Sequence, residues 1–552
     1  MPTRRELLKM GLMMGAALLL PPAGAGAEGP RVGPQGMGGG GMGGGGTGGG
    51  GGGGMGGLTS PPPTPFTDDL PVPSPLVPEV RTDEKGEYDF YNLSVEVGQW
   101  QFIPKLATET WGYRARTEGV PLPNPLPKDP LRVPGPVIVA QRDRRVKVKF
   151  KNSLNLTPGA ECAGDHVVVH LHGGHVPVEA DGHMMDMIMP GMDKTYEYPN
   201  NQPGAMIWFH DHTMDRTCTH VIHGITGIYI IHDPAEDQLG LPSGAYDIPL
   251  VIQDRSFLAD GSFDYTLTHH ALMHGYHGDV ALVNGAIQPK LSVQGRKYRF
   301  RLLNGSNGRF YELALSNGRS FVQIAGDGSL LPEPVTRKTI YLAPGERIEV
   351  VIDFAPAANT KVVLKNLLSS GRTGDIMRFD IGRRVSDGSR VPSTLCKIAG
   401  LAESEAVKAR TFTLGMSVDG MFTINGEPFN HHVVNEVTTL DAVEIWEFVN
   451  PMGMAHPMHV HDILWQVLDR NGVTRPAHEA GWKDTWVVPP RGRTRVIGKF
   501  ADYTCSPMVM DHKSSYMYHC HILEHEEHGM MGQFRVLQEG EELKLPEEPM
   551  PM

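Results

Sequence analysis

One stretch near the C-terminus, residues 518–530, constrains the fold of this chain more than any other. It reads YHCHILEHEEHGM. In an extended strand, residues two apart share a face and the residue between them points the other way, so His519 and His521 would oppose Cys520. Cys520, His525 and Met530 offer a thiolate, an imidazole and a thioether. With one distant histidine they would form the trigonal site with a weak axial Met that suits an electron-transfer copper. A closed zinc site is the alternative at this point.

Length and charge bound the remaining possibilities. The chain has 552 residues, too many for one hydrophobic core, and a formal net charge of −12. A net negative charge gives no support for binding nucleic acid or an anionic membrane surface. There are five cysteines, at positions 162, 218, 396, 505 and 520. If Cys520 holds a metal, up to two disulfides are possible among the other four, and their pairing is open.

Both ends of the chain have the composition of non-globular segments. Residues 1–27 resemble a twin-arginine signal peptide, with Arg4-Arg5 before an apolar run that is too short to span a bilayer. This predicts export to the periplasm or outside the cell, with no stable membrane insertion. Residues 28–85 are rich in glycine and proline and are predicted to be a disordered linker. Residues 541–552 are predicted to be an acidic tail.

Between these ends the pattern is of short β-like runs separated by turn residues, with little helical periodicity. A Pro/Gly turn leading into a strand recurs at residues 190–198, 344–350 and 490–496. Three similar copies at nearly even spacing predict three tandem β-sandwich domains in an all-β protein. The predicted domains are 86–237, 238–388 and 405–540.

Histidines recur in a pattern that a metal cluster would require. Four His-x-His pairs follow or lie within β-like runs: His170 and His172, His210 and His212, His459 and His461, His519 and His521. Each pair would present two imidazoles on one strand face. Eight imidazoles converging between the first and third domains could hold several copper ions. His456 supplies the distant histidine for the Cys520 site.

These four segments resemble the copper-binding motifs of the multicopper oxidases, and in particular three-domain bacterial laccases of the spore-coat and bilirubin-oxidase type. The likeness covers roughly residues 88–537 and includes the GWKD motif at 481–484. It implies three cupredoxin-like Greek-key domains and four copper ions. By motif, the type 1 copper takes His456, Cys520, His525 and Met530. The type 2 copper takes His170 and His459. The type 3 pair takes His172, His210, His212, His461, His519 and His521.

The resemblance also implies a reaction. A donor would lose one electron at a time at the Cys520 site, and dioxygen would be reduced to water at the histidine cluster. Glu526 and Asp181 match family carboxylates that act near the cluster, and ordinary structural carboxylates are the alternative for each. The donor is a phenol, an aromatic amine or a bilin, or else a metal ion: Cu(I), Fe(II) or Mn(II). A non-enzymatic copper-binding protein is a further alternative, and a monomer is expected.

Two further groups of soft or borderline ligands have no matched role. The segment His183–Met192 holds five methionines, which either bind Cu(I) or fill space in the protein interior. The cluster His269, His270, His274 and His277, with Met273, forms either an auxiliary copper site or a solvated histidine-rich loop.

Overall fold

The computed structural model describes residues 59–124, 126, 129–157 and 159–544. Strands dominate this part of the chain and form six sheets, which sort along the sequence into three pairs. The all-β prediction is therefore confirmed. The predicted signal peptide, the linker up to residue 58 and the tail from residue 545 lie outside the described residues. Within the described ranges, no helix is long and apolar enough to cross a membrane.

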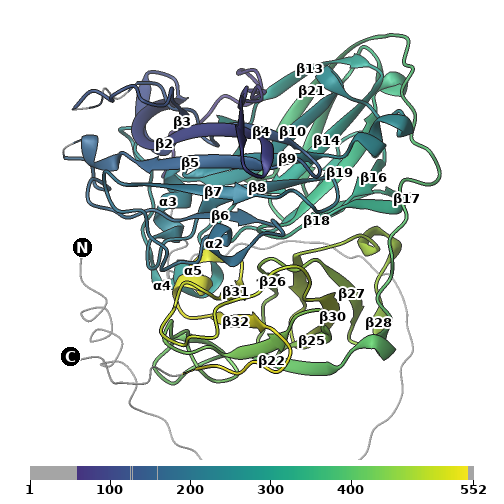
Figure 1. The fold of residues 1–552 in the computed structure, drawn as a ribbon. Helices are drawn as coiled ribbons and strands as arrows, with labels where there is room; N and C mark the ends of the chain where they lie inside the picture. The colour runs from purple at the N-terminus through teal and green to yellow at the C-terminus, as the bar shows by residue number, and fades with distance from the viewer. Residues whose placement is uncertain (1–58, 125, 127–128, 158, 545–552) are drawn as a thin grey trace, which may run out of the picture. The chain divides into compact units, whose positions relative to one another are not determined.

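The first sandwich is built from two sheets that enclose one apolar core (Figure 1). One sheet has the order β1 (Glu79–Asp83), β2 (Gly86–Ile103), β5 (Val146–Asn152) and β7 (Asp193–Tyr198), with β3 (Leu106–Ala115) also paired to β2. The other has the order β4 (Val137–Gln141), β9 (Thr226–His232), β8 (Ala205–Asp211) and β6 (Val169–His172).

The second sandwich is built from the two sheets formed by the middle part of the chain. Its first sheet has the order β12 (Ala286–Ile287), β11 (Val280–Val283), β10 (Asp247–Arg255), β14 (Lys297–Asn304), β19 (Arg347–Asp353), β16 (Phe321–Ala325) and β17 (Leu330–Arg337). Its second has the order β13 (Lys290–Gly295), β21 (Asp375–Arg384), β20 (Lys361–Asn366), β15 (Tyr311–Leu315) and β18 (Ile340–Leu342). Phe300, Phe354 and Phe379 meet in the core between them.

The third sandwich contains the C-terminal strands. One sheet has the order β23 (Phe422–Ile424), β22 (Lys408–Met416), β25 (Val443–Asn450), β30 (Gly492–Lys499), β27 (Trp465–Arg470) and β28 (Val473–Thr474). The other has the order β24 (Glu436–Thr439), β32 (Met531–Leu537), β31 (Tyr516–Cys520), β26 (His456–Val460) and β29 (Thr485–Val488). Trp446, Trp465 and Trp486 are fully buried between these sheets.

The three sandwiches repeat one topology. Each contains a run of three strands in which the first two are parallel and the third is antiparallel to the second: β2, β5 and β7, then β10, β14 and β19, then β22, β25 and β30. The third strand of each run is the one that follows the repeated Pro/Gly turn. A parallel pair cannot be joined by a hairpin, so the chain must cross to the other sheet between the two strands.

Helices are short and lie at the ends of sheets. The α-helices are α2 (Val178–Asp181), α3 (Thr217–His223), α4 (His269–His274) and α5 (Leu523–Glu527). The 3-10 helices are η1 (Leu154–Leu156), η2 (Pro234–Leu239), η3 (Gly244–Tyr246), η4 (Ala355–Ala357), η5 (Gly371–Thr373), η6 (Glu403–Glu405) and η7 (Ala477–Glu479). Helices α3 and α4 both contact α5, so parts of all three sandwiches meet there (Figure 1).

The structure differs from the sequence prediction for residues 59–85, which were expected to belong to a disordered linker. Leu70 is buried in the core of the second sandwich, and its backbone N–H donates to the carbonyl of Lys290. The N–H of Leu76 donates to Val137, and β1 pairs with β2. The prolines of this segment have no backbone N–H to donate. The remaining N–H groups and the buried Leu70 side chain nevertheless hold the segment against the first and second sandwiches.

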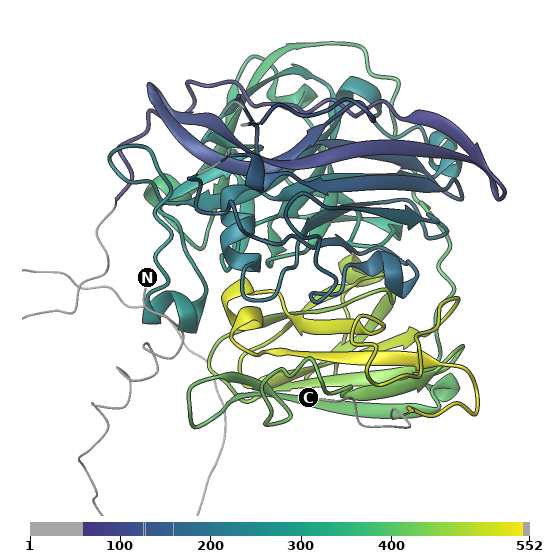
Figure 2. The same ribbon diagram turned by 60° about the vertical axis from the view of Figure 1, so that its left-hand side comes forward.

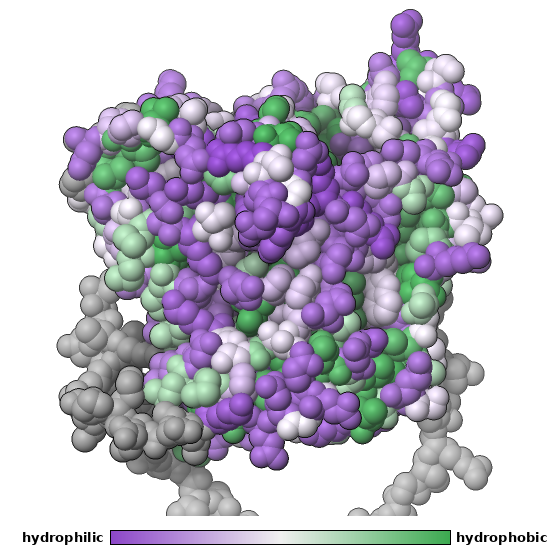
Figure 3. Space-filling view, viewed as in Figure 1, coloured by the Kyte–Doolittle hydropathy of each residue, from purple (hydrophilic) through white to green (hydrophobic). Residues whose placement is uncertain are grey.

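All five cysteines are free thiols in the structure. In the turned view, the yellow C-terminal part of the third sandwich lies on the side that faces the first sandwich (Figure 2). Polar residues cover most of the face seen in Figure 3, and apolar residues form small separate groups on it.

Candidate metal centre

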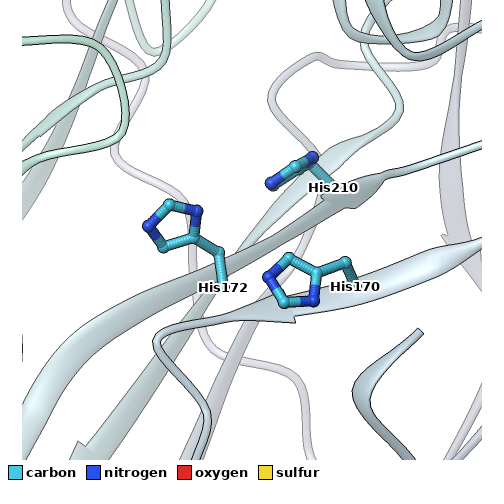
Figure 4. Close-up of side chains that lie close together, drawn as sticks. All are labelled: His170, His172 and His210. Carbon is cyan, nitrogen blue, oxygen red and sulfur yellow. The ribbon is translucent and has the colours of Figure 1, made fainter. Parts of the chain in front are cut away.

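Two pairs of neighbouring strands place the His-x-His motifs opposite one another. In the first sandwich, β6 and β8 are antiparallel and set His170 across from His210. In the third, β26 and β31 set His459 across from His519. Figure 4 shows His170 and His172 extending from the same side of β6, with His210 beside them. The alternation of a strand therefore produces the predicted geometry at both places.

The eight predicted histidines converge between the first and third sandwiches, and all are at most 1% exposed. Nε2 of His170 lies 3.3 Å from Nε2 of His459. Nε2 of His519 lies 3.3 Å from that of His212 and 3.2 Å from that of His461. Two nitrogens on one tetrahedral ion, each about 2.0–2.1 Å from it, would be about 3.3–3.4 Å apart.

The outer nitrogens show that a cation fits this cluster. His459 Nδ1 lies 2.9 Å from the carbonyl oxygen of Asp484, and His170 Nδ1 lies 2.7 Å from that of Asp181. If each imidazole donates its one proton outward, its lone pair points into the cluster. Burial holds the pKa of His170 and of His461 well below the usual value, so both rings are neutral. Buried lone pairs that face one another are unfavourable unless a cation lies between them.

The Cys520 site is equally compact. Its sulfur lies 3.5 Å from Nδ1 of His456 and 3.7 Å from Nδ1 of His525, and these two nitrogens are 3.3 Å apart. Met530 is fully buried in the same core, and its carbonyl accepts the backbone N–H of Cys520. Burial raises the pKa of the Cys520 thiol. A thiolate would therefore form here only with a metal cation to stabilise it.

Both predicted carboxylates lie against the histidine cluster. Asp181 Oδ2 is 2.7 Å from Nδ1 of His461. Glu526 Oε2 is 2.9 Å from Nδ1 of His519, although the contact is not aligned as a hydrogen bond. Burial raises the pKa of Asp181 and brings that of Glu526 to about 7. Both side chains are therefore placed to exchange protons with the cluster.

A glycine fixes the position of Asp181. Helix α2 ends at Gly182, whose φ is +85°. A Cβ on this residue would lie 2.1 Å from the carbonyl oxygen of Val169 in β6. No other residue could occupy the position without moving the strand that carries His170.

Sequence reasoning gave no role to Asp484, which the structure places in the centre. Its carboxylate is 3.0 Å from Nε2 of His172 and 2.7 Å from Nη1 of Arg347. Although burial opposes ionisation, the adjacent Arg347 guanidinium holds the pKa of Asp484 well below its usual range. Both side chains are inaccessible to solvent. The signal was the GWKD motif, since β29 begins directly after it and pairs with β26.

A helix of the second sandwich covers the Cys520 site. Nε2 of His525 lies 3.3 Å from the carbonyl oxygen of Met273 in α4, and the Phe422 ring packs on His525 with 4.1 Å between ring centres. His269, His270 and His274 on α4 are exposed, and the rings of His270 and His274 are 4.7 Å apart. The exposed histidines of α4 therefore adjoin the Cys520 site.

The methionine-rich segment divides between the interior and the surface. Met184 is buried in a small cluster with Met517 and Met531, which shows packing at this position. Met189 and Met192 are exposed. The sulfur of a further methionine, Met187, lies 3.2 Å from Nδ1 of His166.

Comparison with known proteins agrees with this geometry. Three segments match family models of multicopper oxidases, at residues 131–236, 253–374 and 403–540. These segments fall on the three predicted domains, whose boundaries stay predictions. The laccase of Bacillus subtilis is 33% identical over 531 residues, covering 84% of this chain and 97% of that protein. A multicopper oxidase of Staphylococcus haemolyticus is 31% identical, covering 84% and 91%.

A solved structure of a multicopper oxidase from Pediococcus acidilactici aligns with a TM-score of 0.75 and 30% identity, covering 88% of this chain and 94% of that one. The fold is thus one of cupredoxin-like β-sandwich domains, as predicted. The chain belongs to the multicopper oxidase family. It is an oxidoreductase that uses dioxygen, and its cofactor is copper, with four ions in the arrangement standard for the family.

Proposed function

We propose that this protein is a laccase-like oxidase of phenols, aromatic amines or bilins. The observation that carries the proposal is the direct link between two sites: Cys520 is the last residue of strand β31, and its chain neighbours His519, in the strand, and His521, directly after it, both lie in the histidine cluster. The sulfur belongs to the small centre with His456 and His525, and the flanking imidazoles belong to the eight-histidine cluster.

We assign the ligands by their match to the family motifs, and the short distances between their nitrogens support the assignment. His456, Cys520, His525 and Met530 would hold the type 1 copper, and His170 and His459 the type 2 copper. The type 3 pair would be held by the remaining six: His172, His210, His212, His461, His519 and His521. When bound, the copper ions take single electrons from a donor and deliver four of them to dioxygen, giving two waters.

The chain's own residues handle protons and donor access. Dioxygen reduction consumes four protons, and Glu526 and Asp181 each present a buried carboxyl group at a cluster histidine. The Met273 carbonyl accepts a hydrogen bond from His525 Nε2, which fixes the ring with Nδ1 toward Cys520. Any donor must therefore approach over α4 or beside it.

A metal-ion donor is the second candidate, and α4 favours it. His270 and His274 are four residues apart on a helix, the spacing that puts two imidazoles on one face for metal binding. His274 directly follows Met273, so a peptide bond joins it to the Met273 carbonyl group that His525 contacts. A cuprous or ferrous ion held there would be separated from His525 by a few covalent bonds and one hydrogen bond.

Oxygen uptake by the copper-loaded protein tests these proposals. We expect uptake with 2,6-dimethoxyphenol, an aromatic amine or bilirubin, four copper ions per chain, and an intense blue absorption band. Cys520→Ser should abolish both the band and the uptake, whereas Cys505→Ser, which changes another buried thiol of the same sandwich, should keep both. An undiminished band in Cys520→Ser would contradict the site assignment. Copper binding with no oxygen uptake on any donor would favour a copper-binding protein.

We also propose that the chain is exported by the twin-arginine route and acts in the periplasm or outside the cell as a monomer. The basis is the Arg4-Arg5 sequence and the short apolar run that follows it. Replacing both arginines by lysine should retain the protein in the cytoplasm. Undiminished export of that variant would count against this route.

A further inference from the structure

Three histidines far from the copper ligands in sequence meet at the surface of the third sandwich. His431 and His432 precede β24, and His512 lies in the loop before β31. The ring centre of His512 is 4.8 Å from that of His432 and 5.7 Å from that of His431. The rings of His431 and His432 are 3.9 Å apart. His432 is exposed, and the other two are partly buried.

One ring nitrogen of His432 and one of His512 lie at the separation expected of two ligands of the same metal ion. Nδ1 of His432 and Nε2 of His512 lie 3.4 Å apart. That is longer than an ordinary hydrogen bond between nitrogen and its acceptor. It equals, within 0.1 Å, the 3.3 Å between His456 and His525 at the type 1 site. It is also about the distance that two ligands of one tetrahedral ion would have.

One strand fixes both histidine-bearing loops from beneath. Gln533 and Arg535 lie two residues apart on β32 and so face the same side. The Gln533 amide donates to the carbonyls of His431, at 3.0 Å, and Val433, at 2.8 Å. The buried Arg535 guanidinium donates to the carbonyls of Ser506, Met508 and Asp511 at 2.6–2.8 Å. The loops are therefore held in place before any ion binds, which lowers the entropic cost of binding.

The local turn and the local charge suit a cation. Asn430 Oδ1 accepts the N–H of His432, and the Asn430 carbonyl accepts that of Val433, which closes the turn that presents the two imidazoles. Lys513, the cation next to His512, is paired with Asp186 at 3.0 Å. Burial and the neighbouring imidazoles lower the pKa of His431 and His512. The rings of His431 and His512 are thus neutral near pH 7, the form that binds metals.

We propose that Nδ1 of His432 and Nε2 of His512 form a two-histidine surface site for a borderline divalent transition-metal ion, of the class of Zn²⁺ and Cu²⁺, in addition to the four coppers, with the His431 ring packed beside it. Imidazole nitrogens are preferred ligands of both ions. The ion would join the loop 506–512 to the turn 430–433. The site does not depend on the donor or on the proton relay proposed above.

Equilibrium dialysis of the copper-loaded protein against Zn²⁺ tests the site. We expect one zinc ion per chain to be retained with no loss of copper. His432→Ala and His512→Ala should each weaken zinc binding at least tenfold. The matched control is His232→Ala, which removes a histidine whose side chain is 40% exposed and paired with Asp237 in the first sandwich. It should bind zinc as the unmodified protein does.

Three outcomes would overturn the proposal: the unmodified protein retains no more zinc than His432→Ala and His512→Ala do, His232→Ala loses zinc equally, or zinc enters only as copper leaves. Oxidation of 2,6-dimethoxyphenol verifies folding, because neither variant touches a copper ligand and both should keep this activity. A second readout uses Cu²⁺ as a fifth equivalent. It should add a non-blue electron paramagnetic resonance signal with nitrogen couplings, absent from both variants. The same signal in the variants would also contradict the site.

Discussion

His525 and Met273 join the third and second sandwiches beside the Cys520 site. The Nε2 atom of His525 lies 3.3 Å from the carbonyl oxygen of Met273, while its Nδ1 faces Cys520. The third sandwich supplies Cys520 and His525, and α4 of the second sandwich lies over them. The proposed metal site and the proposed donor surface therefore come from different parts of the chain, as is common where loops and short helices on a rigid scaffold carry function.

The α4 histidines separate the two donor classes. The double variant His270→Ala with His274→Ala removes both imidazoles and leaves the Met273 carbonyl in place. We expect its kcat/KM for Cu(I) or Fe(II) to fall about tenfold or more, and that for 2,6-dimethoxyphenol to stay within about twofold. Steady-state oxygen uptake measures both. Equal rates of metal oxidation with and without the two histidines would contradict a metal-donor site on α4.

Glu526 is expected to supply protons to the cluster. Glu526→Gln keeps the size of the side chain but removes its acid, so oxygen reduction should slow by about 10²-fold. Reduction of the blue centre by a phenol under anaerobic conditions should not change. Stopped-flow measurements resolve the two steps. Glu527→Gln is the matched control, because Glu527 is a partly buried neighbour in the same helix whose carboxylate accepts the backbone N–H of Cys218 instead of facing the cluster. If both half-reactions slow equally in Glu526→Gln, the side chain is structural.

Asp484 should stabilise the fold through Arg347. Asp484→Ala leaves a fully buried guanidinium without its main partner, which commonly costs about 3–5 kcal/mol. Urea denaturation of the copper-free protein measures the free energy of unfolding. The control is Glu447→Ala, which removes the partner of the half-exposed Arg493 and should cost less than about 1 kcal/mol. Similar losses in the two variants would show that the Asp484–Arg347 pair is not a major contributor.

His175 should make stability depend on pH. Its ring lies 2.8 Å from Asp462 and 2.9 Å from Asp502, so it connects the first sandwich to the third. Although burial opposes protonation, the two carboxylates raise the pKa of His175 to about 9. Because this exceeds the unfolded value of about 6.5, the stabilisation is complete below pH 6.5 and is lost as the pH rises through 9.

The expected size of this pH effect is at most about 3 kcal/mol. Urea denaturation of the copper-free protein between pH 6 and pH 9.5 should show the decline, and His175→Gln should reduce it. The part that remains is expected from His220: although burial opposes its protonation, the carboxylates of Asp211 and Asp165 also raise its pKa to about 9. His478→Gln is the control: burial lowers the pKa of His478 to about 4, so it does not titrate in this range. A decline that persists unchanged in His175→Gln would rule out this origin.

Local patterns were sufficient for most of the copper-binding set. His170 and His172, or His519 and His521, face one way because strand geometry alternates with a period of two, which is visible in the sequence. The repeated Pro/Gly turns predicted three domains for the same reason, since a turn and the strand after it are local features. For residues 59–85 local composition misled, because a single buried side chain, Leu70, and a few backbone hydrogen bonds overrode the low-complexity signal.

What the sequence by itself determined is therefore which residue types lie on which face of a strand, and through them the copper-binding motifs. Only the tertiary structure decided which distant strands and loops meet. Asp484 reaches His172 across 312 positions, Met273 reaches His525 across 252, and His432 reaches His512 across 80. These contacts depend on strand register and on the packing of separate sandwiches, which are set by long-range burial and hydrogen bonding rather than by any periodicity along the chain.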